Sequence, residues 1–412
     1  MRISRANSIG DLKRMARQYL PNIAFNFIEG GVEDEACLTR NPHAFGEYLF
    51  LPNYLVDVSG RSQKTELLGR AYDSPVGIAP TGGAGMWRRG ADLMLAQAAA
   101  TANVPFILSC ASISSVESVV GIAGKNVWFQ SYATKDPAIG ESLLVTAQAS
   151  GVETLVVTID VPVTGKRERN LRNGFTRPLK LTPSIVLDGL LHPRWLAKYL
   201  ANGAKMPMME NWADFLPAGA SADEVLAFYG KQTPSDSQSW EKLERIRDRW
   251  KGKLILKGVL SPNDAERAFA TGVDGLILSN HGGRQFDVAP PPISILPLVR
   301  RAVGPNRLVM IDSGIQRGTD ILKAIALGAD FAFVGRATLY GVIAGGSAGA
   351  LRALDILRGE IATNMGILGC NKIYEVREKA MVSRAGETLG ASSSSRAEIA
   401  SETNRILSLN TR

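Results

Sequence analysis

An apolar run, Gly275-Leu276-Ile277-Leu278, is followed directly by the polar loop Ser279-Asn280-His281-Gly282-Gly283-Arg284-Gln285. The run has the length and composition of a buried strand. Just beyond it, the loop places a proton acceptor, His281, three residues from a permanent cation, Arg284. The two glycines between them allow backbone and ligand to approach closely. A base beside a cation that can bind an anion suits removal of a proton from a small carboxylate substrate. The alternative interpretation of this loop is a buried histidine in a glycine-rich turn with no chemical role.

The same alternation of a short apolar run and a longer helical stretch recurs along the chain. The runs are Pro75–Pro80, Phe106–Ser109, Val127–Gln130, Thr154–Asp160, Lys253–Lys257, Gly275–Asn280, Leu308–Asp312 and Phe331–Gly335. Continuous apolar strands that alternate with helices predict an α/β protein with a parallel sheet covered on both faces. Eight such units predict a closed (β/α)8 TIM barrel, whose active site lies at the C-terminal ends of the strands. The alternative, a doubly wound open sheet, requires a G-x-G-x-x-G turn, and Thr81-Gly82-Gly83-Ala84-Gly85 lacks that spacing.

We predict a single domain over residues 1–384, followed by a tail over residues 385–412. The domain begins with a helical segment of about 70 residues, in which residues 8–36 are predicted to be helical with Ser8 as a plausible cap. The tail is rich in Ser and Ala and is expected to be a flexible arm to which we assign no chemistry.

A long insertion separates the fourth apolar run from the fifth. About ninety residues lie between Asp160 and Lys253, too many for one crossover, so an inserted segment is expected over about residues 170–250. Within it, residues 177–215 mix apolar and aromatic residues with Lys and Arg, a composition that suits peripheral contact with a membrane. The alternatives are an active-site lid and a loop packed on the barrel.

Composition and charge limit the classes of partner. The 412 residues are 45% hydrophobic and carry a formal net charge of +8, which suits anionic substrates, phosphate cofactors or an anionic membrane surface. A dense Lys/Arg block with interleaved aromatic residues is lacking, so we expect no nucleic-acid partner. Cys37, Cys110 and Cys370 are too widely spaced for a disulfide framework or a metal cluster. We therefore expect no metal and a cytoplasmic protein, peripheral on the inner face of the membrane if the insertion binds there.

Polar residues follow the apolar runs, and a barrel would bring them to one mouth. Ser109, Gln130 and Thr158 suit hydrogen bonds to the polar edge of a flat heterocycle. Lys257 closes a buried apolar run, where it suits stabilisation of an anionic, reduced form of such a ring.

The ends of the last two runs have the composition of a phosphate site. Gly314 and Gly335 offer backbone N–H groups, while Arg317 and Arg336 offer charge-assisted hydrogen bonds. Phosphate sites after strands 7 and 8 recur on this fold, and Asp312 suits a ribose-like polyol. Together these residues predict a mononucleotide cofactor, and a flavin fits them best.

This set of residues resembles the FMN-dependent 2-hydroxy acid dehydrogenases and oxidases over roughly residues 5–380. The resemblance rests on Ser279–Gln285, on Asp312-Ser313-Gly314 with Arg317-Gly318-Thr319-Asp320, and on Glu29-Gly30-Gly31-Val32-Glu33-Asp34-Glu35. It is strongest to the members that oxidise mandelate. Gly82 matches a small residue that leaves room for an aromatic substrate, and Asp188-Gly189 with His192-Pro193-Arg194-Trp195 is similar to their membrane-binding insertion.

The resemblance implies FMN as cofactor and oxidation of an L-2-hydroxy acid, bulky or mandelate-like, to the 2-oxo acid. It also implies a homotetramer, with a quinone, another carrier or O2 as electron acceptor. The FMN-binding residues that it implies are Pro80, Thr81, Gly82, Ser109, Gln130, Thr158, Lys257, Ser279, Asp312, Ser313, Gly314, Gln316, Gly335 and Arg336.

The resemblance further implies catalytic roles. His281 takes either the α-proton or the hydroxyl proton of the substrate, and Asp160 stabilises the imidazolium that forms. Arg167 and Arg284 hold the carboxylate, and Tyr132 hydrogen-bonds the substrate. Taken alone, Arg167 would be interpreted as part of a solvated run of charged residues. Two arginines in a pocket without water, however, supply the positive electrostatic field that stabilises the negative charge formed in this reaction.

Three positions depart from the family pattern. Phe25 stands where members usually carry a substrate-binding tyrosine, and the lost hydrogen bond is worth roughly 1.5–3 kcal/mol. Gln316 replaces a basic residue near the phosphate, and Asn53 replaces an arginine. Phe25 motivates a second hypothesis, that the same FMN barrel acts on an atypical, biosynthetic hydroxy acid or performs oxidative decarboxylation. A third hypothesis is a non-catalytic protein that binds an anionic ligand or a membrane.

Overall fold

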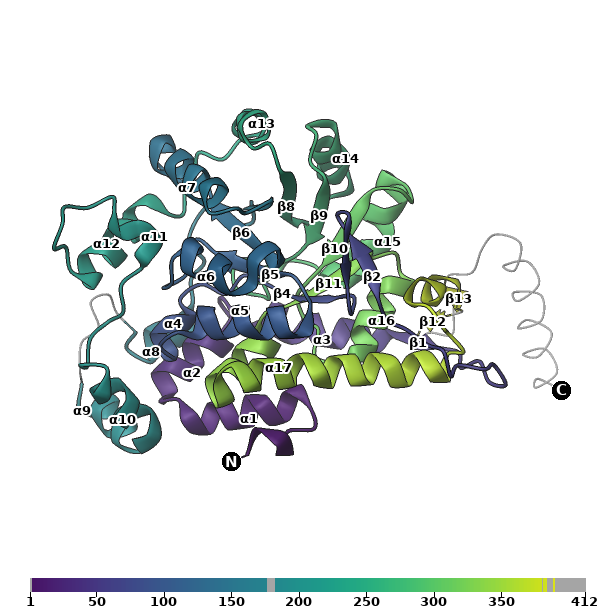
Figure 1. Ribbon diagram of the computed structural model, residues 1–412, viewed down its shortest axis with the longest axis horizontal. Coiled ribbons are helices and arrows are strands. Elements are labelled where there is room, and N and C mark those ends of the chain that lie inside the picture. The colour runs from purple at the N-terminus through teal and green to yellow at the C-terminus, as the bar shows by residue number, and fades with distance from the viewer. Residues whose placement is uncertain (1, 176–181, 380, 384–387, 390–412) are drawn as a thin grey trace.

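The computed structural model describes residues 2–175, 182–379, 381–383 and 388–389. At its centre is a closed barrel of parallel strands in the order β10-β11-β4-β5-β6-β7-β8-β9 (Figure 1). The strands are β4 (Val76–Ile78), β5 (Phe106–Ser109), β6 (Val127–Tyr132), β7 (Thr154–Thr158), β8 (Lys253–Val259), β9 (Gly275–Leu278), β10 (Leu308–Ile311) and β11 (Phe331–Val334). Each overlaps one of the predicted apolar runs, so the predicted TIM barrel is confirmed.

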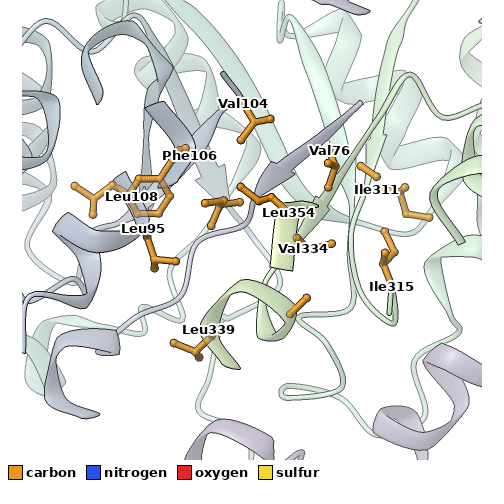
Figure 2. Close-up of a cluster of buried hydrophobic side chains, with 14 of the residues drawn as sticks. Val76, Leu95, Val104, Phe106, Leu108, Ile311, Ile315, Val334, Leu339 and Leu354 are labelled. Carbon is orange, nitrogen blue, oxygen red and sulfur yellow. The ribbon is translucent and has the colours of Figure 1, made fainter. Parts of the chain in front are cut away.

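Side chains along each strand alternate between two cores, because successive residues point to opposite faces of a sheet. In β5, Phe106 and Leu108 belong to the outer core and Ile107 to the inner one. Figure 2 shows part of the outer core, around Phe106 and Leu108. Aromatic rings fill the inside of the barrel, where the centroids of Trp128 and Phe333 lie 5.4 Å apart. The barrel is thus solid in the middle, and a ligand site has to lie at its ends.

Helices cover the outside of the barrel in the order that the alternating pattern predicts. They are α5 (Ala91–Ala102), α6 (Val116–Ala123), α7 (Pro137–Ala149), α13 (Trp240–Arg249), α14 (Pro262–Ala270), α15 (Pro292–Val303), α16 (Gly318–Ala326) and α17 (Arg336–Ile367), with the short η3 (Gly124–Asn126) before β6. The long α17 contains a kink at Gly346, whose φ is 66°. Among the helices of the described residues, none has both the length and the apolar character needed to cross a bilayer.

The N-terminal segment is only partly helical. It comprises η1 (Ile3–Arg5), α1 (Ile9–Tyr19), α2 (Asn22–Glu29), α3 (Ala36–Ala44), η2 (Phe45–Glu47), β1 (Tyr48–Phe50), β2 (Thr65–Leu67) and β3 (Arg70–Tyr72). The prediction of one helix over residues 8–36 is wrong. Leu20 is extended, with φ −94° and ψ 141°, because the ring of Pro21 disfavours the helical conformation in the residue before it. The break lets α1 pack along α17 while α2 lies at the barrel mouth.

The insertion after β7 consists of two parts with different burial. Its helices are α8 (Glu168–Arg172), α9 (Pro183–Leu190), α10 (Pro193–Ala201), α11 (Glu210–Ala213) and α12 (Ala222–Gln232). Trp212 of α11 is fully buried and its indole N–H donates to the carbonyl of Cys110 at 2.7 Å, so the second part packs on the barrel. In contrast, α9 and α10 project from the body of the protein (Figure 1). The inserted residues end before α13, which buries Leu243 in the outer core, so the expected range of about 170–250 ran too far.

The chain beyond α17 returns to the N-terminal segment. It contains η4 (Ile373–Glu378), β12 (Met381–Ser383) and β13 (Thr388–Leu389), and β12 pairs with β1 in antiparallel fashion. Apart from residues 388–389, the predicted tail lies outside the described residues, as does the start of the predicted membrane segment at residues 177–181.

Candidate functional site

A cavity of about 430 Å³ opens at the C-terminal ends of the barrel strands. Most of the residues predicted for the site line it: Pro80, Thr81, Gly82, Tyr132, Thr158, Lys257, His281, Arg284, Asp312, Ser313, Gly314, Gln316, Gly335 and Arg336. Ser109, Gln130, Asp160, Arg167 and Ser279 lie outside this lining, and several of them contact it. The fold therefore gathers residues from the ends of seven of the eight strands around one space, as expected for this architecture.

Phe25 is placed differently from the prediction. It is buried, with its ring stacked on Tyr340 at 6.4 Å between centroids and the guanidinium carbon of Arg17 lying 5.0 Å from its centroid. The aromatic residue of α2 that lines the cavity is Phe27. Residues two apart on a helix point in nearly opposite directions, so the two rings cannot share one side. Phe25, predicted to face the substrate, therefore lies outside the cavity lining, and Phe27 lies at the cavity instead.

The loop after β9 adopts an unusual backbone conformation around the candidate base. His281, Gly282 and Gly283 have successive φ values of 58°, 64° and 75°. A histidine in this left-handed region is uncommon, and such residues cluster at functional sites. Two serine hydroxyls hold the loop, because Ser279 Oγ accepts from the N–H of His281 and Ser313 Oγ accepts from the N–H of Gly282, each at 3.0 Å. The loop after β10 thus helps to fix the base.

Electrostatics keep His281 in the form that accepts a proton. Its Nδ1 lies 2.9 Å from Asp160 Oδ1, so Nδ1 carries the proton and Nε2 is the acceptor. Burial lowers the pKa of His281 despite the attraction of Asp160, which leaves the ring neutral at pH 7. Burial would raise the pKa of Asp160, but the His281 ring beside it holds that pKa below its usual value. Tyr132 Oη lies 3.4 Å from His281 Nε2, and burial raises the pKa of this phenol, which keeps its proton as a donor.

Half-buried arginines give the cavity a positive field. Burial lowers the pKa of Arg284, and the neighbouring Arg167 and Arg336 lower it further. An arginine side chain nevertheless keeps its proton in proteins. The lowered pKa therefore reports an unfavourable concentration of positive charge, and a bound anion would relieve it. Arg167 Nη2 donates to Gln285 Oε1 at 3.1 Å, so it belongs to the same wall as the loop after β9.

The C-terminal end of α2 orients two of these arginines. Arg284 Nη1 donates to the carbonyl of Gly30 at 2.6 Å, and Arg336 Nε donates to the carbonyl of Ile28 at 3.1 Å. The last carbonyls of a helix are unsatisfied and partly negative, so they suit guanidinium donors. A Cβ on Gly31 would lie 2.7 Å from the carbonyl oxygen of Gly283, so the close approach of the segment after α2 to the loop after β9 requires glycine. The N-terminal segment is thus a structural part of the site.

Lys257 and Asp312 form a buried ion pair below the cavity. Lys257 Nζ lies 3.0 Å from Asp312 Oδ2 and donates to Ser279 Oγ at 2.7 Å. The side chains of the pair are 5% and 9% exposed, so neither charge is well solvated. Asp312, expected to face a polyol, lines the cavity and at the same time balances the lysine.

Removing one partner of this pair is expected to be costly. Lys257→Met leaves Asp312 buried without its cation, and we expect the free energy of unfolding to fall by about 3–5 kcal/mol. Urea denaturation of the protein without added ligand measures the change. The control is Lys253→Met, at the start of the same strand as Lys257. It breaks a more exposed pair with Asp274 and should cost less than about 1 kcal/mol. Equal losses in the two variants would contradict this account, and adding Asp312→Asn to Lys257→Met should restore part of the stability.

Buried polar atoms at the strand ends fit a polar, planar ligand. Thr81 Oγ1, Gln130 Nε2 and Thr158 Oγ1 are buried and have no hydrogen-bond partner among the described residues. Unpaired buried polar groups are rare and indicate a missing partner. They come from the ends of β4, β6 and β7, and a heterocycle with N–H and C=O groups along one edge would satisfy them. Ser109 Oγ fixes the side chain of Gln130, because it donates to Gln130 Oε1 at 3.0 Å.

The phosphate end of the predicted site differs in part from the expectation. Gly314, Gly335 and the start of α17 line the cavity, and a helix N-terminus with free N–H groups suits a phosphate. Arg336 also lines it, but its guanidinium already donates to main-chain carbonyls. Arg317, expected in the cradle, pairs instead with Glu360 at 2.9 Å and lies outside the lining. Backbone amides therefore dominate this end of the cavity.

Several lining residues could not be predicted from the motifs. Phe27, Trp87 and Tyr340 come from the N-terminal segment, the short α4 (Ala84–Trp87) and α17. The hydroxyl of Tyr340 donates to the carboxylate of Glu29, which links two of these segments at the wall. No local pattern marks such residues, since their role depends on how distant segments pack.

Comparison with known proteins finds a matching family and relatives that are similar over most of the chain. A family model described as FMN-dependent dehydrogenase matches residues 16–383. The chain is 41% identical to (S)-mandelate dehydrogenase of Pseudomonas putida over 367 residues, which covers 89% of this chain and 91% of the relative. It is 37% identical to a putative L-lactate dehydrogenase of Mycobacterium tuberculosis over 377 residues, or 91% of this chain and 89% of the relative.

Solved structures with similar folds include a mandelate dehydrogenase and a mandelate oxidase. A crystal structure of the monotopic membrane protein (S)-mandelate dehydrogenase has a TM-score of 0.85 and 40% identity, over 90% of this chain and 98% of that one. A mandelate oxidase solved with (S)-2-phenylpropionate has a TM-score of 0.76 and 30% identity, over 94% of this chain and 99% of that one.

Proposed function

The chain belongs to the family of FMN-dependent dehydrogenases, and from this premise we propose that it oxidises a bulky, mandelate-like L-2-hydroxy acid to the 2-oxo acid. It is an FMN-dependent 2-hydroxy acid dehydrogenase or oxidase. The observation that carries the finer proposal is the neutral His281 facing a cavity whose wall holds Arg284. A base beside an anion-binding cation is what removal of a proton from a hydroxy acid requires.

The residues divide the work as follows. The guanidinium groups of Arg284 and Arg167 bind the substrate carboxylate and orient the α-carbon. His281 Nε2 takes one proton, from the α-carbon or from the hydroxyl, and Asp160 stabilises the imidazolium. The Tyr132 hydroxyl donates a hydrogen bond to the substrate oxygen as negative charge develops there. Two electrons and two protons leave the substrate in total, and FMN, when bound, accepts the electrons.

Residues of the strand ends would hold the FMN. Gln130, Thr158 and Thr81 would form hydrogen bonds with its polar ring edge, because each has a buried polar side-chain atom that lacks a hydrogen-bond partner among the described residues. Lys257 would lie at the N1–C2 carbonyl edge and stabilise a negative charge on the reduced ring. The backbone around Gly314 and Gly335 would bind the phosphate. Pro80, Gly82, Ser109, Ser279, Asp312, Ser313, Gln316 and Arg336 complete the proposed set.

The function is tested by mixing the FMN-loaded protein, without oxygen, with (S)-mandelate, L-lactate and glycolate in turn. Loss of the oxidised-flavin absorbance within seconds on addition of mandelate would support the proposal. A yellow protein that none of the three acids reduces would overturn it. A colourless protein that does not bind FMN would favour the non-catalytic hypothesis instead.

A second candidate follows from Phe27. Because this ring lines the cavity without a hydroxyl, Phe27 itself would donate no hydrogen bond to the substrate. That gap favours an atypical, biosynthetic hydroxy acid, or oxidative decarboxylation of the product. Analysis of the product formed in the presence of O2 separates simple oxidation from oxidative decarboxylation. Decarboxylation would use O2 as the second two-electron oxidant, release CO2 and shorten the acid by one carbon.

We further propose that the segment from 177 to 215 rests on a membrane at its inner face. Leu187, Leu190 and Leu191 of the α9 region are 59%, 59% and 71% exposed, and basic residues such as Lys198 accompany them. Exposed apolar side chains accompanied by basic ones suit the headgroup region of an anionic bilayer. Asn22 Nδ2 donates to Asp188 Oδ1 at 2.7 Å, so the segment is tied to α2 and hence to the cavity wall.

Changing Leu187, Leu190 and Leu191 together to Glu is expected to reduce binding to vesicles that contain anionic lipid by at least about tenfold, because buried apolar area is lost. Sedimentation with the vesicles measures it, and flavin reduction should stay unchanged. Val145→Glu, at an exposed apolar position on α7, is the control. Unaltered binding of the triple variant would refute the proposal. Deleting all of residues 177–215 is a poorer test, since it removes the buried Trp212.

The electron acceptor and the assembly are also proposals. A membrane-bound position favours a quinone over a soluble carrier or O2, and the rate of flavin reoxidation with each acceptor tests this. We propose a homotetramer, which sedimentation equilibrium of the FMN-loaded protein checks.

A further inference from the structure

Three aromatic side chains from separate segments form one cluster at the cavity. Phe27 comes from α2, Trp87 ends α4, and Phe175 follows α8. The ring centroid of Phe27 lies 5.1 Å from that of Trp87 and 5.0 Å from that of Phe175. The centroids of Trp87 and Phe175 lie 6.0 Å apart. Interplanar angles of 46°, 41° and 50° give a tilted arrangement typical of favourable aromatic contacts. We call these three residues the aromatic cluster.

Within the aromatic cluster, Phe27 and Trp87 present apolar surface to the cavity beside charged groups. All three side chains are half-buried, and Phe27 and Trp87 belong to the same cavity lining as His281 and Arg284. Apolar surface kept open in a cavity is unfavourable unless a ligand covers it. The aromatic cluster therefore has the character of a binding surface.

Its position relative to Arg284 indicates which part of a ligand covers it. The guanidinium carbon of Arg284 lies 5.4 Å from the ring centroid of Phe27. A carboxylate held by Arg284 is consequently close to the aromatic cluster. The α-carbon of a 2-hydroxy acid bears a carboxylate, a hydroxyl, a hydrogen and one side chain. With the first three directed to the arginines, Tyr132 and His281, the side chain is the group left to meet apolar surface.

We infer that the aromatic cluster recognises the substrate's side chain and selects an aromatic one, with Trp87 as the main specificity-determining residue. The inference rests on the proposed function. Trp87 offers the largest ring of the three and stands five residues after Gly82, in the segment that follows β4. A fourth ring that packs edge to face on tilted rings gains contact energy beyond the area it buries, whereas a methyl group gains little.

The test compares an aromatic with a small acid in the FMN-loaded protein. Trp87→Ala is expected to lower kcat/KM for (S)-mandelate by about 10–200-fold, because part of the apolar contact to the ring is lost. The same change should lower kcat/KM for L-lactate by less than about threefold. Calorimetry with phenylacetate and acetate, which lack the hydroxyl, should show a matching loss of preference for phenylacetate. Trp87→Phe should keep most of the preference.

The matched control is Trp240→Ala, on α13, where Arg267 lies over the tryptophan ring. It should change neither the ratio of kcat/KM for mandelate to that for lactate nor the ratio of phenylacetate to acetate binding. Equal losses for mandelate and lactate in Trp87→Ala, or an unchanged phenylacetate-to-acetate ratio, would overturn the inference. If Trp87→Ala does not fold, Phe175→Leu gives the same test, with the same ratio expected to fall. If no hydroxy acid reduces the wild type, the proposed function fails, yet the phenylacetate-to-acetate ratio still decides whether the aromatic cluster binds rings.

Discussion

His281→Gln is expected to lower the rate constant for flavin reduction by mandelate by about 10²–10⁴-fold, while FMN stays bound. Glutamine preserves polarity and much of the volume at this position but cannot take a proton at neutral pH. The neutral imidazole, with Nδ1 bonded to Asp160 and Nε2 available, is the feature that is lost. Anaerobic stopped-flow absorbance measures the rate, and the ratio of flavin to protein absorbance checks the cofactor.

The matched control is ligand binding without chemistry. Phenylacetate should bind His281→Gln within about threefold of the wild type, because the arginines that hold a carboxylate are unchanged. A variant that still reduces FMN at more than about a tenth of the wild-type rate would show that His281 is not the base.

The pH dependence of the reduction provides a second check on His281. Because burial lowers its pKa, the base should remain neutral, and the rate should hold, at pH values below 6.5, before falling in more acidic solution. Asp160→Asn removes the carboxylate that raises this pKa, so the acidic limb should move to still lower pH. The maximal rate should fall as well, because a base of lower pKa is weaker and the imidazolium loses its partner. A limb that moves to higher pH would contradict the arrangement.

The barrel could be predicted from the sequence because its strands are buried on both faces. A run such as Leu308–Ile311 is continuously apolar, and a polar residue, Asp312, follows at the mouth. Once eight such units are recognised, the fold itself determines that their ends meet. That is why His281, Lys257 and Asp312 could be predicted to share one cavity without knowledge of any contact.

Packing between distant segments could not be predicted in the same way. On α2, Phe25 and Phe27 lie about 200° apart around the axis, and either could have faced the cavity. The choice depends on Tyr340, which receives Phe25, some three hundred residues further along the chain. Arg317 was expected at the phosphate for its type alone, yet Glu360 on α17 draws it away. Local patterns identify candidate residues, but such tertiary partners decide between them.

Arg284→Met is expected to weaken phenylacetate binding and to lower kcat/KM for mandelate by about 30–5,000-fold. Removing one member of a buried charge pair costs about 2–5 kcal/mol, and about 1.36 kcal/mol corresponds to a factor of ten. Methionine keeps the length of the side chain but neither the charge nor the donors. The kcat/KM of Arg284→Lys should fall between those of the wild type and Arg284→Met. Lysine keeps the charge but loses the planar guanidinium that the carbonyls of Gly30 and Ile28 orient.

The same substitution should not destabilise the protein without its substrate. Desolvation lowers the pKa of the half-buried Arg284, and repulsion by the nearby Arg167 and Arg336 lowers it further. Removing one of three cations relieves that repulsion, so the urea midpoint of Arg284→Met should equal or exceed that of the wild type. Loss of binding together with retained stability would identify Arg284 as a group held in an unfavourable field for the sake of an anion. Lower stability with intact phenylacetate binding would instead make Arg284 a structural residue that ties α2 to the loop after β9.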